Sequence, residues 1–175
     1  MLQSLNRYID LFEKYTISVA FAAATLLLFA NVVLRYIFDS GLTWVLETVQ
    51  YLFAWVVLVG AAHGVKAGIH LGIDVVVVKL KPSMRKATTV LAVLCCIGFV
   101  AIVDYESLIY ILKIYDWGDR TQDLQIPQWI PYLAIPIGMS LMLYHFLFIA
   151  WQILTDQREL IHSSQMPKEI EELEK

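Results

Sequence analysis

Four stretches of the sequence are apolar over a length that crosses a membrane, and segments with charges, glycine or proline separate them. An α-helix rises about 1.5 Å per residue, so about 20 residues cross a hydrocarbon core about 30 Å thick. The pattern predicts four transmembrane spans, over about 16–37, 44–65, 87–112 and 129–151. We therefore expect an all-α integral membrane protein, with one transmembrane domain over residues 1–155 and a short cytoplasmic tail over 156–175.

Two segments beside the spans have patterns of their own. Residues 2–14 place apolar side chains at helical spacing between charged ones, which predicts a short amphipathic helix lying on the membrane surface. Pro127, Pro131 and Pro136 crowd the start of the last apolar run, which predicts a loop entry and a kink there.

The second span carries a carboxylate just inside its outer end. Trp44 opens this span, and 18 uncharged residues separate Glu47 from Lys66, which cover roughly 27 Å of helix. A carboxylate in such a run is costly in lipid, so Glu47 should face protein, water or a cation. One helical stripe, suited to close packing against another helix, holds Glu47, Gln50, Tyr51, Ala54, Leu58 and Ala61.

Composition supports a membrane protein. The chain has 175 residues, of which 59% are hydrophobic and only 17% are charged, whereas soluble domains carry about a quarter charged residues. Its mean hydropathy is +0.64. The net charge of −3 gives no sign of a nucleic-acid partner. Cys95 and Cys96 are adjacent in an apolar run, and we interpret them as packing or lipid-facing residues.

The positive charges set the predicted orientation. Ten of the 13 Lys and Arg residues fall on the side that also holds both termini, and three fall on the other side. Cytoplasmic loops carry the excess of Lys and Arg, so both termini should be cytoplasmic. Interfacial anchors that contact membrane lipids are expected at Trp44 and Trp129 outside, and at Trp151, Lys79, Lys81, Arg85 and Lys86 inside.

Two opposite charges flank the first predicted hairpin. Arg35 ends the first span, with Asn31 on the same face four residues earlier, and Glu47 begins the second span. In an antiparallel hairpin they lie at similar depth, which predicts a structural ion pair that locks the hairpin. The alternative is a proton or coupling-ion site, although such a site needs more converging carboxylates or broken helices near the membrane midplane.

Other polar residues inside the spans have packing interpretations. Asp104 and Glu106 fall in the outer part of the third span and should approach the water layer. His63 and His145 differ in depth by roughly 6 Å, which favours helix packing over shared haem ligation. His70 and Asp74 form a poor metal site. We expect no metal, no cofactor and no catalytic group, and hence a protein that is not an enzyme.

The outer loop between the third and fourth spans is rich in charge. The loop from Asp116 to Trp129 carries Asp116, Asp119, Arg120 and Asp123, together with two tryptophans. A solvated loop with interfacial tryptophans accounts for this composition, and contact with a periplasmic partner is the alternative.

Three stretches, in this order and spacing, resemble the small membrane subunit (DctQ type) of TRAP transporters, the tripartite ATP-independent periplasmic transporters. They are NVVLRYIF at 31–38, LTWVLETVQYLFAWVVLVGAAHGVKAGIHLGIDVV at 42–76 and IPQWIPYLAIPIG at 126–138. One departure is that the family often has two consecutive acids after the tryptophan, whereas Leu46 precedes a single Glu47 here.

The resemblance implies a non-catalytic subunit in the bacterial inner membrane. In such systems a periplasmic binding protein captures a carboxylate, of the C4-dicarboxylate or sialic-acid type, and a large membrane subunit carries it inward by a sodium-coupled elevator motion. The small subunit packs on the scaffold of the large one and stabilises it. Two alternatives stay open: a small homodimeric transporter that uses Glu47, and a haem-binding membrane redox subunit.

Overall fold

The computed structural model describes residues 2–66 and 82–155, without the side chains of residues 2–5, 82–86 and 154. Its described elements are all helices: α1 (Leu2–Ile37), α2 (Trp44–Lys66), α4 (Pro82–Trp117), the short α5 (Trp129–Tyr132) and α6 (Ala134–Leu154). Four helical segments are long and apolar enough to span a membrane, namely Asn6–Ile37, Trp44–Lys66, Ala87–Trp117 and Trp129–Ile153. This confirms the predicted all-α class with four transmembrane helices.

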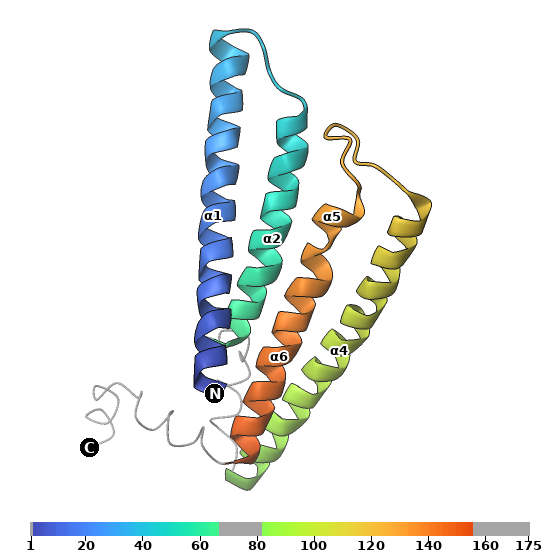
Figure 1. Cartoon of the computed structure of the whole chain (residues 1–175). Coiled ribbons are helices and arrows are strands. Elements are labelled where there is room, and N and C mark those ends of the chain that lie inside the picture. The colour runs from blue at the N-terminus through green and yellow to red at the C-terminus, as the bar shows by residue number, and fades with distance from the viewer. Residues whose placement is uncertain (1, 67–81, 156–175) are drawn as a thin grey trace, which may run out of the picture.

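The long helices lie in an open row rather than a closed bundle. The order across the row is α1, α2, α6 and α4, and the main contacts join neighbours in that order (Figure 1). Helix α6 therefore lies between α2 and α4. In the most apolar stretch of its span 39% of the residues are buried, against 11% in the spans of α1 and α4. Most apolar side chains of the row are consequently not buried between its own helices and are available to contact lipid or another protein.

Helix α1 corrects one prediction. Residues 2–14 do not form a separate helix on the membrane surface, because α1 runs without a break from Leu2 to Ile37. No glycine or proline interrupts this stretch, so nothing in its sequence ends the helix. Its 36 residues extend about 54 Å, far beyond the hydrocarbon thickness, and its first turns pack against other helices.

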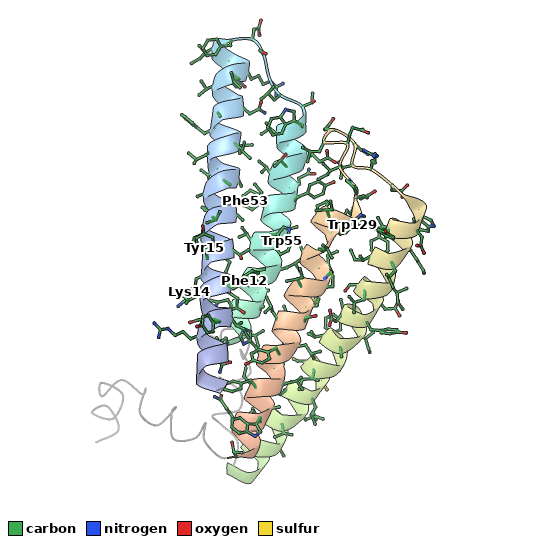
Figure 2. The ribbon with its side chains drawn as sticks, in the orientation of Figure 1. Phe12, Lys14, Tyr15, Phe53, Trp55 and Trp129 are labelled. Atoms are coloured by element: carbon green, nitrogen blue, oxygen red, sulfur yellow. The ribbon has the colours of Figure 1, made fainter. Side chains whose placement is uncertain are left out.

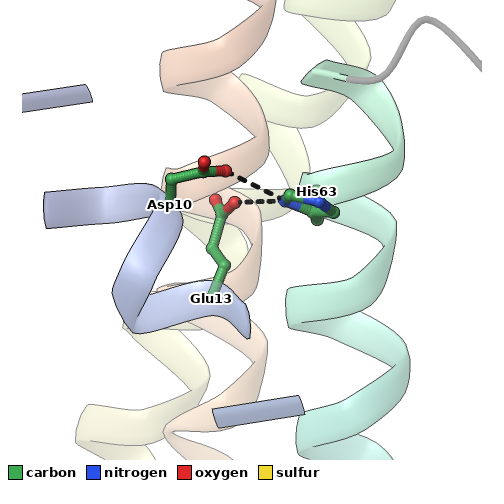
Figure 3. A group of neighbouring side chains, drawn as sticks. All are labelled: Asp10, Glu13 and His63. Carbon is green, nitrogen blue, oxygen red and sulfur yellow. Dashed lines mark hydrogen bonds and ion pairs between the residues drawn. The ribbon is translucent and has the colours of Figure 1, made fainter. Parts of the chain in front are cut away.

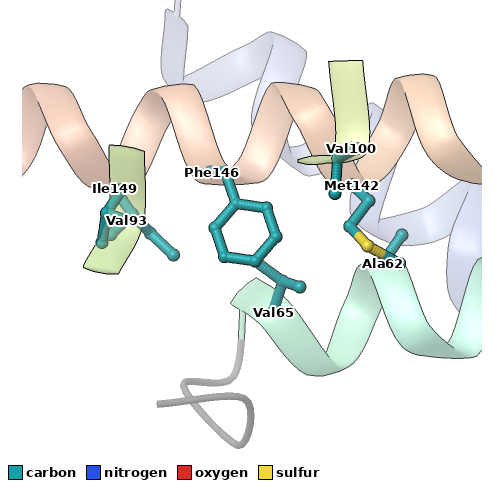
Figure 4. Close-up of a cluster of buried hydrophobic side chains, with 7 residues drawn as sticks. All are labelled: Ala62, Val65, Val93, Val100, Met142, Phe146 and Ile149. Carbon is teal, nitrogen blue, oxygen red and sulfur yellow. The ribbon is translucent and has the colours of Figure 1, made fainter. Parts of the chain in front are cut away.

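Helices α2 and α6 approach each other closely at Gly138. A Cβ at this position would lie 2.7 Å from Cβ of Leu58, so only glycine fits without a shift. Small residues allow helix backbones in membranes to come this near. Toward the inner end, seven side chains from three helices form a buried apolar cluster (Figure 4): Ala62, Val65, Val93, Val100, Met142, Phe146 and Ile149.

Contacts between aromatic rings join α1 to α2 and α4 to α5. Phe53 of α2 meets Phe21 of α1 edge-on with ring centroids 6.2 Å apart, and Trp129 of α5 meets Tyr115 of α4 at 5.9 Å (Figure 2). Helix α5 ends at Tyr132 and α6 begins at Ala134, but Leu133 between them keeps helical backbone angles, and its N–H donates to the Trp129 carbonyl at 3.2 Å. The proline-rich entry therefore makes the helix irregular at this point without breaking it.

Candidate functional site

Two polar clusters join the helices, one toward each end of their long axes. The cluster at the end where α2 begins, called the outer cluster, is centred on Glu47 in the first turn of α2. Its carboxylate accepts hydrogen bonds from the backbone N–H groups of Gln122, Asp123 and Leu124, at 3.0, 2.8 and 2.8 Å. The hydroxyl of Tyr51, one turn along α2, donates a fourth bond at 2.9 Å. Glu47 therefore binds three consecutive amides of the loop between α4 and α5.

The loop around Glu47 is itself closed by hydrogen bonds. The N–H of Thr121 donates to the Ile126 carbonyl at 2.9 Å, and the Arg120 guanidinium donates to the Gln125 carbonyl at 2.9 Å. Gln125 has a φ of 56°, which turns the chain so that it returns toward α5. The side chains of Asp116, Asp119, Arg120 and Asp123 are exposed around this turn.

The predicted ion pair between Arg35 and Glu47 is wrong. Within the described residues no ion pair joins them, because both Glu47 oxygens bind loop amides. The Arg35 side chain is exposed and lies against Gly41 in the turn. The hairpin is closed instead by Asn31, whose Oδ1 accepts a hydrogen bond from the Leu42 N–H at 2.8 Å.

The inner cluster is centred on Glu13 of α1, whose side chain is fully buried. Its Oε2 lies 2.9 Å from Nδ1 of His63 in α2, and its Oε1 lies 2.6 Å from Nε2 of His145 in α6. A carboxylate accepts from two neutral imidazoles when each presents its N–H. Glu13 thus joins three helices, and Tyr144 of α6 adds a second link to α1 by donating to Oδ1 of Asn6.

Charged groups continue this cluster toward the start of α1 and the end of α2. Asp10 lies beside Glu13 and His63 (Figure 3). Lys66 Nζ lies 2.9 Å from Asp10 Oδ1, and Lys14 Nζ lies 3.4 Å from Oδ2. Ligand atoms of Asp10, Glu13 and His63 all lie within 4.8 Å of one another, a spacing that a metal ion would accept. The ammonium of Lys66 already supplies positive charge there, so the geometry favours an ion-pair network.

Glu13 is the site residue that the sequence interpretation missed. A signal was present, because Glu13, His63 and His145 all stand near the inner ends of their apolar runs. Placing residues 2–14 on the membrane surface separated the carboxylate from the two histidines.

The other predicted residues have varied surroundings. Gln50 is exposed, and Tyr51 packs its ring against Tyr132 at 6.5 Å between centroids. Trp44 and Trp151 are exposed and Trp129 is half-buried, all at helix ends. Outside the described residues or side chains lie the basic anchors Lys79, Lys81, Arg85 and Lys86, the pair His70 and Asp74, and the tail 156–175.

The sequence matches the family described as tripartite ATP-independent periplasmic transporters, DctQ component, over residues 24–156. The chain belongs to this family. It is 34% identical to the C4-dicarboxylate TRAP transporter small permease protein DctQ of Vibrio cholerae, over 97% of this chain and 83% of that protein. It is 31% identical to the protein of the same name from Rhodobacter capsulatus, over 83% of this chain and 77% of that protein.

A longer relative is also similar. The isethionate TRAP transporter permease protein DctMQ of Oleidesulfovibrio alaskensis is 22% identical over 59% of this chain, which corresponds to 16% of that protein. The chain is therefore a small permease subunit of a TRAP transporter and a multi-pass membrane protein.

Proposed function

We propose that this subunit serves a sodium-coupled TRAP importer of carboxylates in the bacterial inner membrane, with C4-dicarboxylates as the favoured substrates. It is non-catalytic, has both termini in the cytoplasm, and packs on the scaffold of the large elevator subunit, which it stabilises. The relative from Vibrio cholerae, a C4-dicarboxylate permease matched over 97% of this chain, supports this substrate class over sialic acids.

The open row of helices is the observation that carries the proposal. Its helices contact mainly their neighbours, so the row offers large lateral surfaces to another membrane protein. Substrate sites of secondary transporters are formed by broken helices near the midplane. Within the described residues, the irregular turn at Leu133 keeps helical backbone angles and lies near the Trp129 end of the fourth span, away from its middle. A role in widening the wall of a larger transporter suits this architecture.

The two alternatives have less support. A homodimeric transporter that couples through Glu47 needs a carboxylate free to exchange protons or ions, but Glu47 accepts four hydrogen bonds. To ligate a haem together, His63 and His145 would each have to direct one ring nitrogen at the iron. Instead, each directs a ring nitrogen at the carboxylate of Glu13 between them.

Co-purification tests the proposed association. The chain is expressed with a tagged large TRAP permease subunit, and the membrane complex is captured in mild detergent. We expect stoichiometric retention of this chain, and no transport by the chain reconstituted alone. Failure of the large subunit to retain the intact chain would contradict the proposal.

The outer loop is proposed as a transient contact for the periplasmic binding protein. Glu47 fixes the loop in one shape, and the exposed side chains of Asp119 and Asp123 lie on its surface, whereas the Arg120 guanidinium closes the turn on the Gln125 carbonyl. Reversing the two acidic charges, with Asp119→Lys and Asp123→Lys, should raise the concentration of loaded binding protein needed for half-maximal uptake. Charge reversal at Arg7, which is exposed near the start of α1, is the matched control. Equal uptake by both variants at limiting binding protein would exclude the contact.

A further inference from the structure

Glu106 of α4 lies at a depth where a charge is unexpected. Helix α4 continues to Trp117, so Glu106 stands 11 residues, or about 16 Å, from the aromatic residue at its outer end. The sequence prediction instead placed the acids of the third span near the water layer.

A hydrogen bond to α6 gives a second, independent measure of the depth of Glu106. The Ser140 hydroxyl of α6 donates to the carboxylate of Asp104, at 3.0 and 3.2 Å from its two oxygens. Ser140 stands 11 residues beyond Trp129, the interfacial aromatic of that span. Glu106 is two residues nearer the outside than Asp104, and so about 13 Å below the level of Trp129. Both measures place it inside the hydrocarbon layer.

The surroundings of Glu106 are apolar and open. Its side chain is exposed, and so is Ile102, one turn away on the same side of α4, at 65%. Tyr110, one turn in the other direction, is 44% exposed and packs the rest of its ring against Tyr132 of α5. The buried side of α4, which includes Ser107, faces α6. Among the described residues, Glu106 has no hydrogen bond or ion pair, and every ion pair belongs to the inner cluster.

A carboxylate in this position calls for a partner. A charged side chain near the bilayer centre costs about 2.5–3.5 kcal/mol on insertion scales, and such residues face protein or water rather than lipid. The cost disappears if another protein places a hydrogen-bond donor or a cation against Glu106.

We propose that the face of α4 around Glu106 is where this subunit contacts the large TRAP permease subunit. The large subunit presents to Glu106 an Arg, Lys or His, or a hydroxyl or amide donor, from one of its own membrane helices. This inference rests on the proposed function and adds the helix and the chemistry of the contact.

A second copy of this chain fits the face less well. A two-fold dimer uses the same patch on both copies, so α4 would meet α4 and bring two Glu106 carboxylates together. Of the exposed cations on the outer side, Arg35 and Lys113 lie nearer the helix ends than Glu106 does, and Arg120 lies in the loop beyond α4. Charge complementarity therefore favours a different protein.

Photo-crosslinking in the full complex tests the contact directly. A benzophenone amino acid is introduced at position 106, or at position 108, where the exposed Leu108 points to the other side of α4. We expect crosslinks to the large subunit from position 106 and not from position 108. Crosslinks from position 106 to a second copy of this chain, or to lipid alone, would overturn the proposal.

Substitution of Glu106 distinguishes contact with the large subunit from exposure to lipid. If Glu106 faces the large subunit, Glu106→Leu should weaken retention by that subunit about tenfold or more, and Glu106→Gln, which still hydrogen-bonds, should weaken it less. If Glu106 faces lipid in the complex, Glu106→Leu should leave retention unchanged. The isolated variants are checked for helicity.

These outcomes distinguish a failure of the proposed function from a failure of the Glu106 contact. If the unsubstituted chain is not retained by the large subunit, the proposed function fails and this inference fails with it. If the unsubstituted chain is retained and Glu106→Leu is retained equally well, only the assignment of this face fails.

Discussion

Removing Glu13 should destabilise the protein more than any other single change in the inner cluster. The fully buried carboxylate accepts hydrogen bonds from His63 at 2.9 Å and from His145 at 2.6 Å. Hydrogen bonds to charged groups contribute about 1.5–3 kcal/mol each, so the two amount to roughly 3–6 kcal/mol. Burial of the carboxylate offsets part of this, and breaking a buried charged cluster costs about 3–5 kcal/mol.

We therefore expect Glu13→Ala to lower the free energy of unfolding by about 3–5 kcal/mol, because the ring N–H of the buried His145 loses its acceptor. Glu13→Gln keeps the size and one acceptor oxygen, and should lose about 1–2 kcal/mol. Replacing Glu13 and both histidines together by apolar residues should recover part of the loss, because no polar group is then left buried without a partner.

The assay is equilibrium unfolding of the purified chain in detergent micelles, followed by helical circular dichroism. Asp10→Asn is the matched control, since Asp10 is partly exposed and its replacement should cost less than about 1 kcal/mol. If Glu13→Ala stayed within about 1 kcal/mol of the unsubstituted chain, the cluster would not be what holds α1 to α2 and α6.

Two further predictions concern the α2 contacts. Gly138→Ala should lower the free energy of unfolding by about 1–2 kcal/mol in the same assay, because the added methyl meets α2. Gly60→Ala, which has open space around the added methyl, is the control and should cost nothing or stabilise slightly. Equal effects of the two substitutions would refute the close approach of α2 and α6. Glu47→Ala should make the amides of 122–124 exchange hydrogen about tenfold faster or more, while Arg35→Ala leaves them protected; unchanged protection in Glu47→Ala would contradict the proposed role of the carboxylate.

The helices and their number could be predicted because one physical requirement dominates. Runs without charge that are long enough to cross hydrocarbon satisfy their backbone hydrogen bonds only as helices, and four such runs are present. The order of the row could not be predicted in this way. Surfaces that face lipid and surfaces that face another helix are both apolar, so the pattern does not reveal which helix neighbours α6.

The partners of the two central carboxylates were beyond the sequence for different reasons. Glu47 binds backbone amides of a loop some 75 residues away, and amides leave no trace in side-chain patterns. Arg35, a cation at similar depth, was the partner that charge alone suggests. Glu13 stands in an amphipathic stretch, and amphipathicity favours a membrane surface and a helix interface equally.

Sodium-dependent uptake of labelled C4-dicarboxylate into proteoliposomes tests the central claim most directly. The comparison includes this chain alone, this chain with its large membrane subunit, the large subunit with the periplasmic binding protein, and all three proteins together. The account predicts uptake only in the complete set, and a loss of uptake when this chain is left out. Uptake by this chain alone, or full uptake without it, would contradict the account.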